Sequence, residues 1–234
     1  MKKLFNKKLL AFLLAFSLVV PAFTACGNNS DSGTANSDSQ NTSEYQGNAN
    51  INLGYGFKIS DIGNYTGIYM EDGTDEVVSD VLMIVVTSTS DETLQYAKIT
   101  MRAGENDAVF EVTTLLPGAS IVLLEKNRMS YDKTLTYDYA VAENVSFFPE
   151  EPSLMEDRVK LQFLDGVINI TNISDKDIDG EIVVYYKNAA SDLYYGGITY
   201  RSRVTGGLKV GQTQQIAGAH ASKTGSAAMF VQII

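Results

Sequence analysis

The chain has 234 residues, one cysteine, one histidine, no tryptophan and a formal net charge of −10 at pH 7. Nucleic-acid binding needs a basic surface, so this acidic composition argues against nucleic acid as a partner. One cysteine and one histidine do not make a zinc site, and no complete nucleotide-binding glycine motif is present, so the sequence predicts no cofactor.

The N-terminus has the pattern of a secretory signal. Four lysines precede the apolar run LLAFLLAFSLVV (9–20). A helix of that length spans about 18 Å, too short to cross a hydrocarbon core of about 30 Å. The next motif, FTAC (23–26), resembles the bacterial lipobox, in which the cysteine is acylated and becomes the N-terminus after cleavage. We therefore expect residues 1–25 to be a lipoprotein signal peptide and Cys26 to be the lipid-attachment residue.

This anchor predicts a location at the outer, extracytoplasmic face of a bacterial cell membrane. Two acyl chains hold a protein there stably, whereas one chain does not. Residues 26–50 are rich in Asn, Ser and Gly and poor in apolar side chains, so we expect a disordered tether. Without the four signal lysines the chain keeps 14 basic and 28 acidic residues, a net charge of −14. Membrane attachment is therefore expected from the lipid alone.

The rest of the chain predicts strands. Apolar and polar residues alternate over 97–102, 136–141 and 198–204, which is the pattern of half-buried strands. Clusters of Gly, Asn and Asp, such as EDGTDE (71–76), separate the strands as turns. No stretch after residue 50 has a sustained helical period. Many short strands with such turns predict an all-β fold of the sandwich or barrel type.

An internal repeat divides this β region. VLMIVVTSTSDETLQYAKITM (81–101) and DGVINITNISDKDIDGEIVVY (165–185) align without a gap, and each reads as strand, turn and strand. Further on, LLPGAS (115–120) matches LKVGQT (208–213) at its glycine. Agreement in the order of elements makes duplication a better explanation than chance.

We therefore predict two tandem immunoglobulin-like β-sandwiches. The first module, residues 51–152, is acidic, and the second module spans residues 153–234. The sequence VINITNISDKDIDGEIVVYYKN (167–188) is similar to the small β-sandwich domains of Gram-positive surface lipoproteins, the FxLYD-type group. This resemblance implies an extracytoplasmic binding or scaffold domain.

The second module contains a tyrosine-rich hairpin. Neighbouring side chains on a strand point to opposite faces, so one of each adjacent pair should face outward or meet an interface. Exposed tyrosine suits contact with protein or glycan, because its ring is rigid and amphipathic. The simpler interpretation is that these rings fill the core. The candidate binding residues are Tyr186, Tyr194, Tyr195 and Tyr200.

A weak calcium candidate lies between the two strands of the second repeat copy. Asp175, Asp177 and Asp179 fit the first half of an EF-hand loop. The twelfth position, which needs a bidentate glutamate, is Tyr186, and a hairpin turn explains the aspartates equally well. The acidic cluster EDGTDE (71–76) has the same two interpretations. We therefore predict no metal site, and these three aspartates are the one weak candidate for calcium.

His220 is the only histidine, and no G-x-S-x-G or related nucleophile motif accompanies it. We expect no enzyme activity and predict a lipid-anchored binding or scaffold protein that meets a protein or glycan of the cell envelope. Two alternatives stay open. One is a cell-wall or glycan-binding module that presents the tyrosine hairpin, and the other is an unrecognised hydrolase that uses His220 or the acidic turns.

Overall fold

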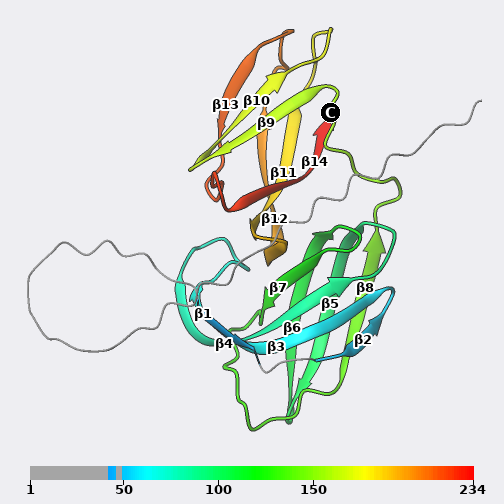
Figure 1. The fold of residues 1–234 in the computed structure, drawn as a ribbon, viewed down its shortest axis with the longest axis vertical. Helices are drawn as coiled ribbons and strands as arrows, with labels where there is room; N and C mark the ends of the chain where they lie inside the picture. The colour runs from blue at the N-terminus through cyan, green and yellow to red at the C-terminus, as the bar shows by residue number, and fades with distance from the viewer. Residues whose placement is uncertain (1–41, 46–48) are drawn as a thin grey trace, which may run out of the picture. The chain divides into compact units, whose positions relative to one another are not determined.

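The computed structural model describes residues 42–45 and 49–234 (Figure 1). Every regular element in these residues is a β-strand, and none is a helix. The all-β prediction is confirmed for this part of the chain, which contains no helix able to cross a membrane. In chain order the strands are β1 (Thr42–Tyr45), β2 (Ile51–Gly54), β3 (Phe57–Ile68), β4 (Val77–Ser88), β5 (Leu94–Ala103), β6 (Asn106–Leu115), β7 (Ser120–Leu124), β8 (Ala140–Phe147), β9 (Val159–Leu164), β10 (Val167–Asn172), β11 (Ile182–Ala190), β12 (Leu193–Val204), β13 (Thr213–Ala217) and β14 (Ser226–Ile233).

The first module is sandwich-like. Strands β3, β4 and β7 pair in that order, and β6, β5 and β8 form a separate three-stranded sheet. One hydrophobic cluster joins the two sheets, because Ile59, Ile84 and Leu123 on one side meet Ile99 and Phe110 on the other. The alternating apolar residues of β5 thus face inward, as their spacing predicts.

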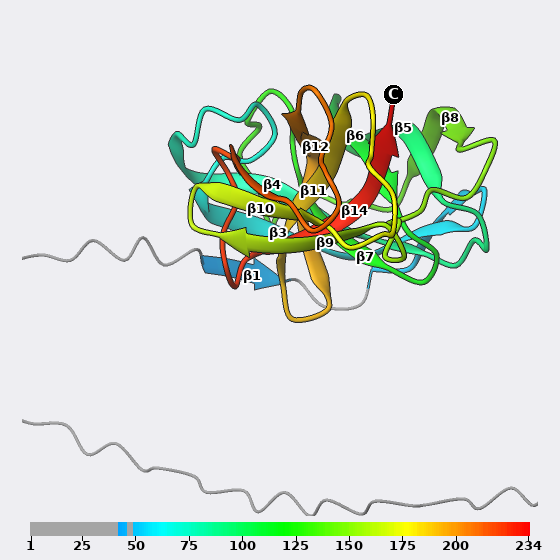
Figure 2. The same cartoon turned by 90° about the horizontal axis from the view of Figure 1, so that it is seen from above.

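The second module repeats this arrangement. Strands β9, β10 and β13 form one sheet, and β12, β11 and β14 pair in the facing layer (Figures 1 and 2). A second cluster joins them, with Ile168 and Ile170 from β10 against Val184, Tyr186 and Val231. The strand order 3-4-7 and 6-5-8 of the first module therefore corresponds to 9-10-13 and 12-11-14 in the second.

The glycine shared by the two repeat copies occupies the same turn. Gly118 lies between β6 and β7, and Gly211 lies between β12 and β13. Both have a φ of +72°, which is the conformation that the third residue of a type II turn requires. In both turns the amide of the next residue donates to the carbonyl three residues earlier, Ala119 to Leu116 and Gln212 to Lys209. The structure therefore supports the repeat seen in the sequence.

Equivalent strands also pair in the same register. Thr87 of β4 lies opposite Ser120 of β7, and Thr171 of β10 lies opposite Thr213 of β13. In each pair the two hydroxyls hydrogen-bond across the strands, at 2.9 and 2.8 Å. Matching positions thus make matching contacts, as duplication predicts.

The two modules share a sheet, which was not expected from the sequence. Strand β12 pairs in parallel with β7, with Tyr194 opposite Ile121 and Tyr195 opposite Val122. The pairing produces an eight-stranded sheet that contains strands of both modules. A third hydrophobic cluster, which includes Tyr65, Met83 and Leu124, covers the outer face of β3, β4 and β7 and reaches Tyr195.

Two sequence predictions need correction. Thr42–Tyr45, inside the tether expected over 26–50, form strand β1 and pair with β3. The alternation at 136–141 marks a loop until β8 begins at Ala140. Tyr137 is buried there because its ring packs in the first hydrophobic cluster, and its hydroxyl donates to the carbonyl of Asp132. The predicted signal peptide, Cys26 and the rest of the tether before Thr42 lie outside the described residues.

Candidate functional site at the junction of the two modules

A large bulge in β12 brings the second module against the first. Tyr186 of β11 pairs with Tyr200 of β12, but Asn188, only two residues on, pairs with Tyr195. Residues 196–199 therefore have only Lys187 opposite them and leave the regular ladder. Bulges of this kind redirect a strand and free its backbone groups for other contacts.

Lys187 holds the bulge from inside the second module. Its side chain is fully buried. The ammonium donates to the carbonyl oxygens of Gly196, Gly197 and Ile198 at 3.1, 3.0 and 2.8 Å. All three ammonium hydrogens thus have acceptors, which offsets much of the cost of burying the charge.

Glu71 holds the same bulge from the first module. It follows β3, and its carboxylate accepts the amide of Gly197 at 2.6 Å and the amide of Leu124, at the end of β7, at 2.9 Å. Gly197 is therefore fixed through its amide by Glu71 and through its carbonyl by Lys187. This side chain ties strands of both modules together.

The pair is electrostatically strained because both groups lie away from water. Burial raises the pKa of the Glu71 carboxyl to about 7, although its two amide hydrogen bonds and Lys187 oppose the shift. Burial lowers the pKa of the Lys187 ammonium to about 7, against the opposing effect of Glu71. Each group thus stabilises the charged form of the other, but the cost of removing both charges from water outweighs their attraction.

Two threonines complete the contact between β6 and β12. Thr113 donates its hydroxyl to the carbonyl of Gly197 at 2.8 Å, and Thr199 donates to the carbonyl of Thr113 at 3.1 Å. The backbones approach so closely that a Cβ on Gly197 would collide with the carbonyl oxygen of Glu111. Only glycine fits at this point of the bulge.

The acidic loop 71–76 is organised by an arginine and does not resemble a metal site. Arg128 binds Asp72 at 3.0 Å and Glu76 at 2.7 Å. Its guanidinium also lies over the ring of Tyr69, 4.6 Å from the centroid. With Glu71 turned into the junction, Asp75 is the remaining acid of this loop.

A pocket of about 580 Å³, which we call the junction pocket, opens beside the bulge. Residues before and within the acidic loop form one wall, and residues of β11, β12 and the segment between β13 and β14 form the other. The described residues that line it include no lysine or arginine. The lining residues are Ile68, Met70, Asp75, Asn188, Ala189, Ala190, Tyr195, Ala219, His220, Ala221, Ser222 and Gly225.

His220 bridges the two walls of the junction pocket. Its Nδ1 lies 3.3 Å from the Oδ1 of Asp75. Its ring stacks on Tyr200 with 4.2 Å between centroids, and a Cβ on Gly73 would lie 3.7 Å from its Nε2. The imidazole is therefore held by Tyr200 on one face and by Asp75 at Nδ1.

The hydroxyls next to His220 are engaged elsewhere. Ser222 accepts the amide of Gly225 at 3.2 Å, and Ser226 accepts the amide of Ser222 at 3.0 Å. Ser226 also donates to the backbone carbonyl of His220 at 3.4 Å. In the described part of the chain these serines thus interact with the backbone and not with the imidazole.

The candidate tyrosines divide between core and junction. Tyr186 points inward from β11 and is buried in the second core against Phe163 and Tyr200. The prediction that it lies on a binding surface is therefore wrong. Tyr194 and Tyr195 are partly buried where β12 meets β7. Tyr200 supports His220, and its own hydroxyl is buried without a hydrogen-bond partner among the described residues.

The three aspartates of the weak calcium candidate do not converge. Asp177 accepts a hydrogen bond from Lys209 at 2.8 Å and from the amide of Val210 at 3.0 Å. The described residues contain no group of three or more acids, histidines or cysteines placed to hold a metal ion. The local geometry is that of a turn braced by a salt bridge.

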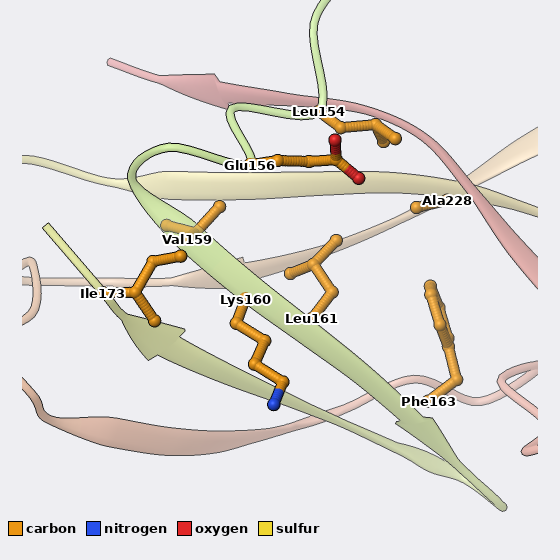
Figure 3. Close-up of a pocket in the computed structure, with 8 residues that line it drawn as sticks. All are labelled: Leu154, Glu156, Val159, Lys160, Leu161, Phe163, Ile173 and Ala228. Carbon is orange, nitrogen blue, oxygen red and sulfur yellow. The ribbon is translucent and has the colours of Figure 1, made fainter. Parts of the chain in front are cut away.

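A second hollow, of about 380 Å³, lies in the second module where β9 and β14 form the edges of the two layers (Figure 3). Leu161 and Phe163 line it from β9, Ala228 lines it from β14, and Leu154 lines it from the preceding segment. None of the residues predicted as site residues lines this hollow.

Three residues of the junction, Glu71, Lys187 and Asp75, are not among the site residues predicted from the sequence. In the sequence, Glu71 and Asp75 belong to an acidic turn, and Lys187 lies in the segment that resembles the FxLYD-type domains. One signal was available, because the unbroken apolar run VLMIVV (81–86) is typical of a strand that is covered on both faces. That signal predicts a partner for the outer face of the first module.

The fold and the junction define an all-β protein in which twelve of the fourteen described strands form two six-stranded units of corresponding strand order that share a sheet. No family model matches the chain, and comparison with curated proteins and with solved structures finds no match either.

Proposed function

We propose that this protein is a lipid-anchored binding or scaffold protein at the outer face of a bacterial cell membrane, without catalytic activity, and that the junction pocket is its ligand site. In this proposal, acylated Cys26 provides the anchor, and the two modules are immunoglobulin-like and related to the FxLYD-type domains. The strand order in each copy is compatible with that assignment. The ligand is a component of the cell envelope.

The junction pocket is the observation that carries the proposal. Its volume of about 580 Å³ lies within the range of about 300–1,000 Å³ that is typical of ligand sites. Both modules contribute to its walls, and the bulge held by Glu71 and Lys187 keeps those walls in register. A ligand bound there would contact a preformed surface and would not have to order it.

The absence of catalysis is proposed because no nucleophile is assembled at His220. A serine hydrolase needs a hydroxyl within hydrogen-bond reach of the imidazole, and the serines beside His220 bond with the backbone. The glycan-binding alternative has less support than the junction pocket, because the tyrosines on which it depends are buried or partly buried.

Capture from a cell-envelope extract tests the proposed site. The full chain would be immobilised and exposed to the extract, and bound molecules would be identified by mass spectrometry. Ala219→Trp fills the exposed mouth of the junction pocket, and Ala217→Trp, also exposed but outside the pocket, is the matched control.

The proposal predicts a bound molecule that the unmodified chain and Ala217→Trp retain and that Ala219→Trp loses. Equal retention by all three proteins would place binding elsewhere and contradict the proposed site. Turnover of a bound substrate that His220→Ala abolishes would replace the binding role with the hydrolase alternative.

A further inference from the structure

Three of the four acids in the loop 71–76 bind groups outside the junction pocket, and this leaves Asp75 for the pocket. Glu71 accepts two backbone amides in the junction. Asp72 and Glu76 share Arg128. Asp75 alone lines the pocket, and about half of its side chain is exposed.

Asp75 is held in place by the fold. Its φ of +58° puts it in the left-handed region, where aspartate is tolerated but uncommon. The Nδ1 of His220 lies against its Oδ1, and Tyr200 stacks on the imidazole ring. Within the described residues no hydrogen bond or ion pair engages its second carboxylate oxygen, so Asp75 is a fixed acceptor beside a cavity. Backbone strain at such a position is a common feature of ligand sites.

We infer that the junction pocket binds a small organic cation, whose ammonium group pairs with Asp75 and whose apolar body lies on Met70, Ile68 and Tyr195. This inference rests on the proposed ligand site and adds the chemical class of the ligand. Among the described lining residues only His220 can carry a positive charge, and it already faces Asp75. An anionic ligand would meet Asp75 without a lysine or arginine to offset the repulsion.

The remaining lining residues suit the other parts of such a molecule. Met70 offers a thioether and Tyr195 a ring, which interact well with an aromatic or aliphatic body. The ring of Tyr195 also attracts a cation through its negative face. Asn188 and Ser222 add polar groups to the lining, and the small alanine side chains leave room for a ligand.

Three probes of one shape test this inference. 2-Phenylethylammonium is the cation, 2-phenylethanol is its neutral counterpart, and 3-phenylpropionate is the anion. Binding of each to the purified full chain would be measured by saturation-transfer NMR and titration. Asp75→Asn removes the charge and keeps the shape, and Asp107→Asn, an exposed acid paired with Arg102, is the matched control.

We expect the cation to bind the unmodified chain and Asp107→Asn equally, and to bind Asp75→Asn about fivefold more weakly, because a partly exposed ion pair contributes about 1 kcal/mol. The anion should bind least. If 2-phenylethanol binds as tightly as the cation, and Ala219→Trp abolishes both, the pocket remains a ligand site but selection for a cation is wrong. If none of the three probes binds, the inferred ligand class is wrong, and the capture experiment still decides the proposed function separately.

Discussion

At the scale of single residues, the junction depends on two buried charges that share one backbone segment. Lys187 binds three carbonyls of the β12 bulge, and Glu71 binds the amide of Gly197 within it. Burying such a pair costs free energy that hydrophobic residues would not cost. The pair fixes the course of the bulge. Its carbonyls and the Gly197 amide no longer bond to a neighbouring strand, so they need a buried donor, Lys187, and a buried acceptor, Glu71.

The pH dependence of stability should report on this pair. Between about pH 4.5 and 7 the folded protein keeps a proton on Glu71 that the unfolded chain has lost, so the free energy of unfolding falls as pH rises. Between about pH 7 and 10.5 the folded protein has lost a proton from Lys187 that the unfolded chain keeps, so the free energy of unfolding rises with pH. The pair therefore predicts a minimum of stability near pH 7.

Urea unfolding at pH 5, 7 and 9 checks this prediction. From pH 5 to 7 we expect Glu71 to contribute a loss of about 2 kcal/mol. Glu71→Gln should remove that contribution, whereas Glu143→Gln, at an exposed salt bridge with Lys98, should keep it. If Glu71→Gln and the unmodified chain show the same change between pH 5 and 7, the proposed cause is wrong.

At the scale of elements, the two units differ in the buried polar residue that ends the second strand of each, Ser88 in β4 and Asn172 in β10. Asn172, at the end of β10, is fully buried and donates to the carbonyls of Lys176 and Leu208. The equivalent residue in β4 is Ser88, whose buried hydroxyl has no hydrogen-bond partner among the described residues. The serine side chain is too short to reach the neighbouring turn, so the first unit lacks the two hydrogen bonds that Asn172 makes in the second.

Local patterns predicted the elements better than they predicted the junction. The alternation in 97–102 and 198–204 and the glycines of the two equivalent turns lie where strands and turns form, because these depend on neighbours in sequence. The β12 bulge depends on Glu71, which is 126 residues away from Gly197. No local period encodes a contact of that kind, and Tyr186 was misplaced because alternation alone does not say which face of a strand is covered.

The bulge predicts a strong effect from a small substitution. Gly197→Ala should lower the free energy of unfolding by at least about 2 kcal/mol, because its Cβ would collide with backbone and the strands must separate. Gly225→Ala is the matched control, since its Cβ would lie 3.3 Å from the Ser222 hydroxyl, and we expect a loss below about 1 kcal/mol. Chemical denaturation of both variants measures the difference, and equal losses would contradict the packing described for β6 and β12.

At the scale of the whole molecule, the two modules are joined in the structure, and the sequence predicts a lipid anchor before them. The described residues belong to one compact unit. The shared sheet and the third hydrophobic cluster supply the apolar contact between modules, and the junction residues supply the polar contact. A pocket whose walls come from both modules keeps its shape only while they remain joined.

The anchor predicts where the protein is found. In cell fractionation we expect the unmodified chain in the membrane fraction and Cys26→Ala released from it, because without acyl chains an acidic surface has no attraction to anionic lipid. Substitution of a tether serine, Ser30→Ala, should leave the distribution unchanged. Full membrane retention of Cys26→Ala would exclude lipidation as the cause of attachment.

The most direct test of the joined modules is calorimetric unfolding of the full chain. If the modules form one unit around the junction pocket, the chain should unfold in a single transition whose calorimetric enthalpy equals its van't Hoff enthalpy. Two separate transitions, or a calorimetric enthalpy about twice the van't Hoff value, would show that the modules unfold independently and would contradict the account.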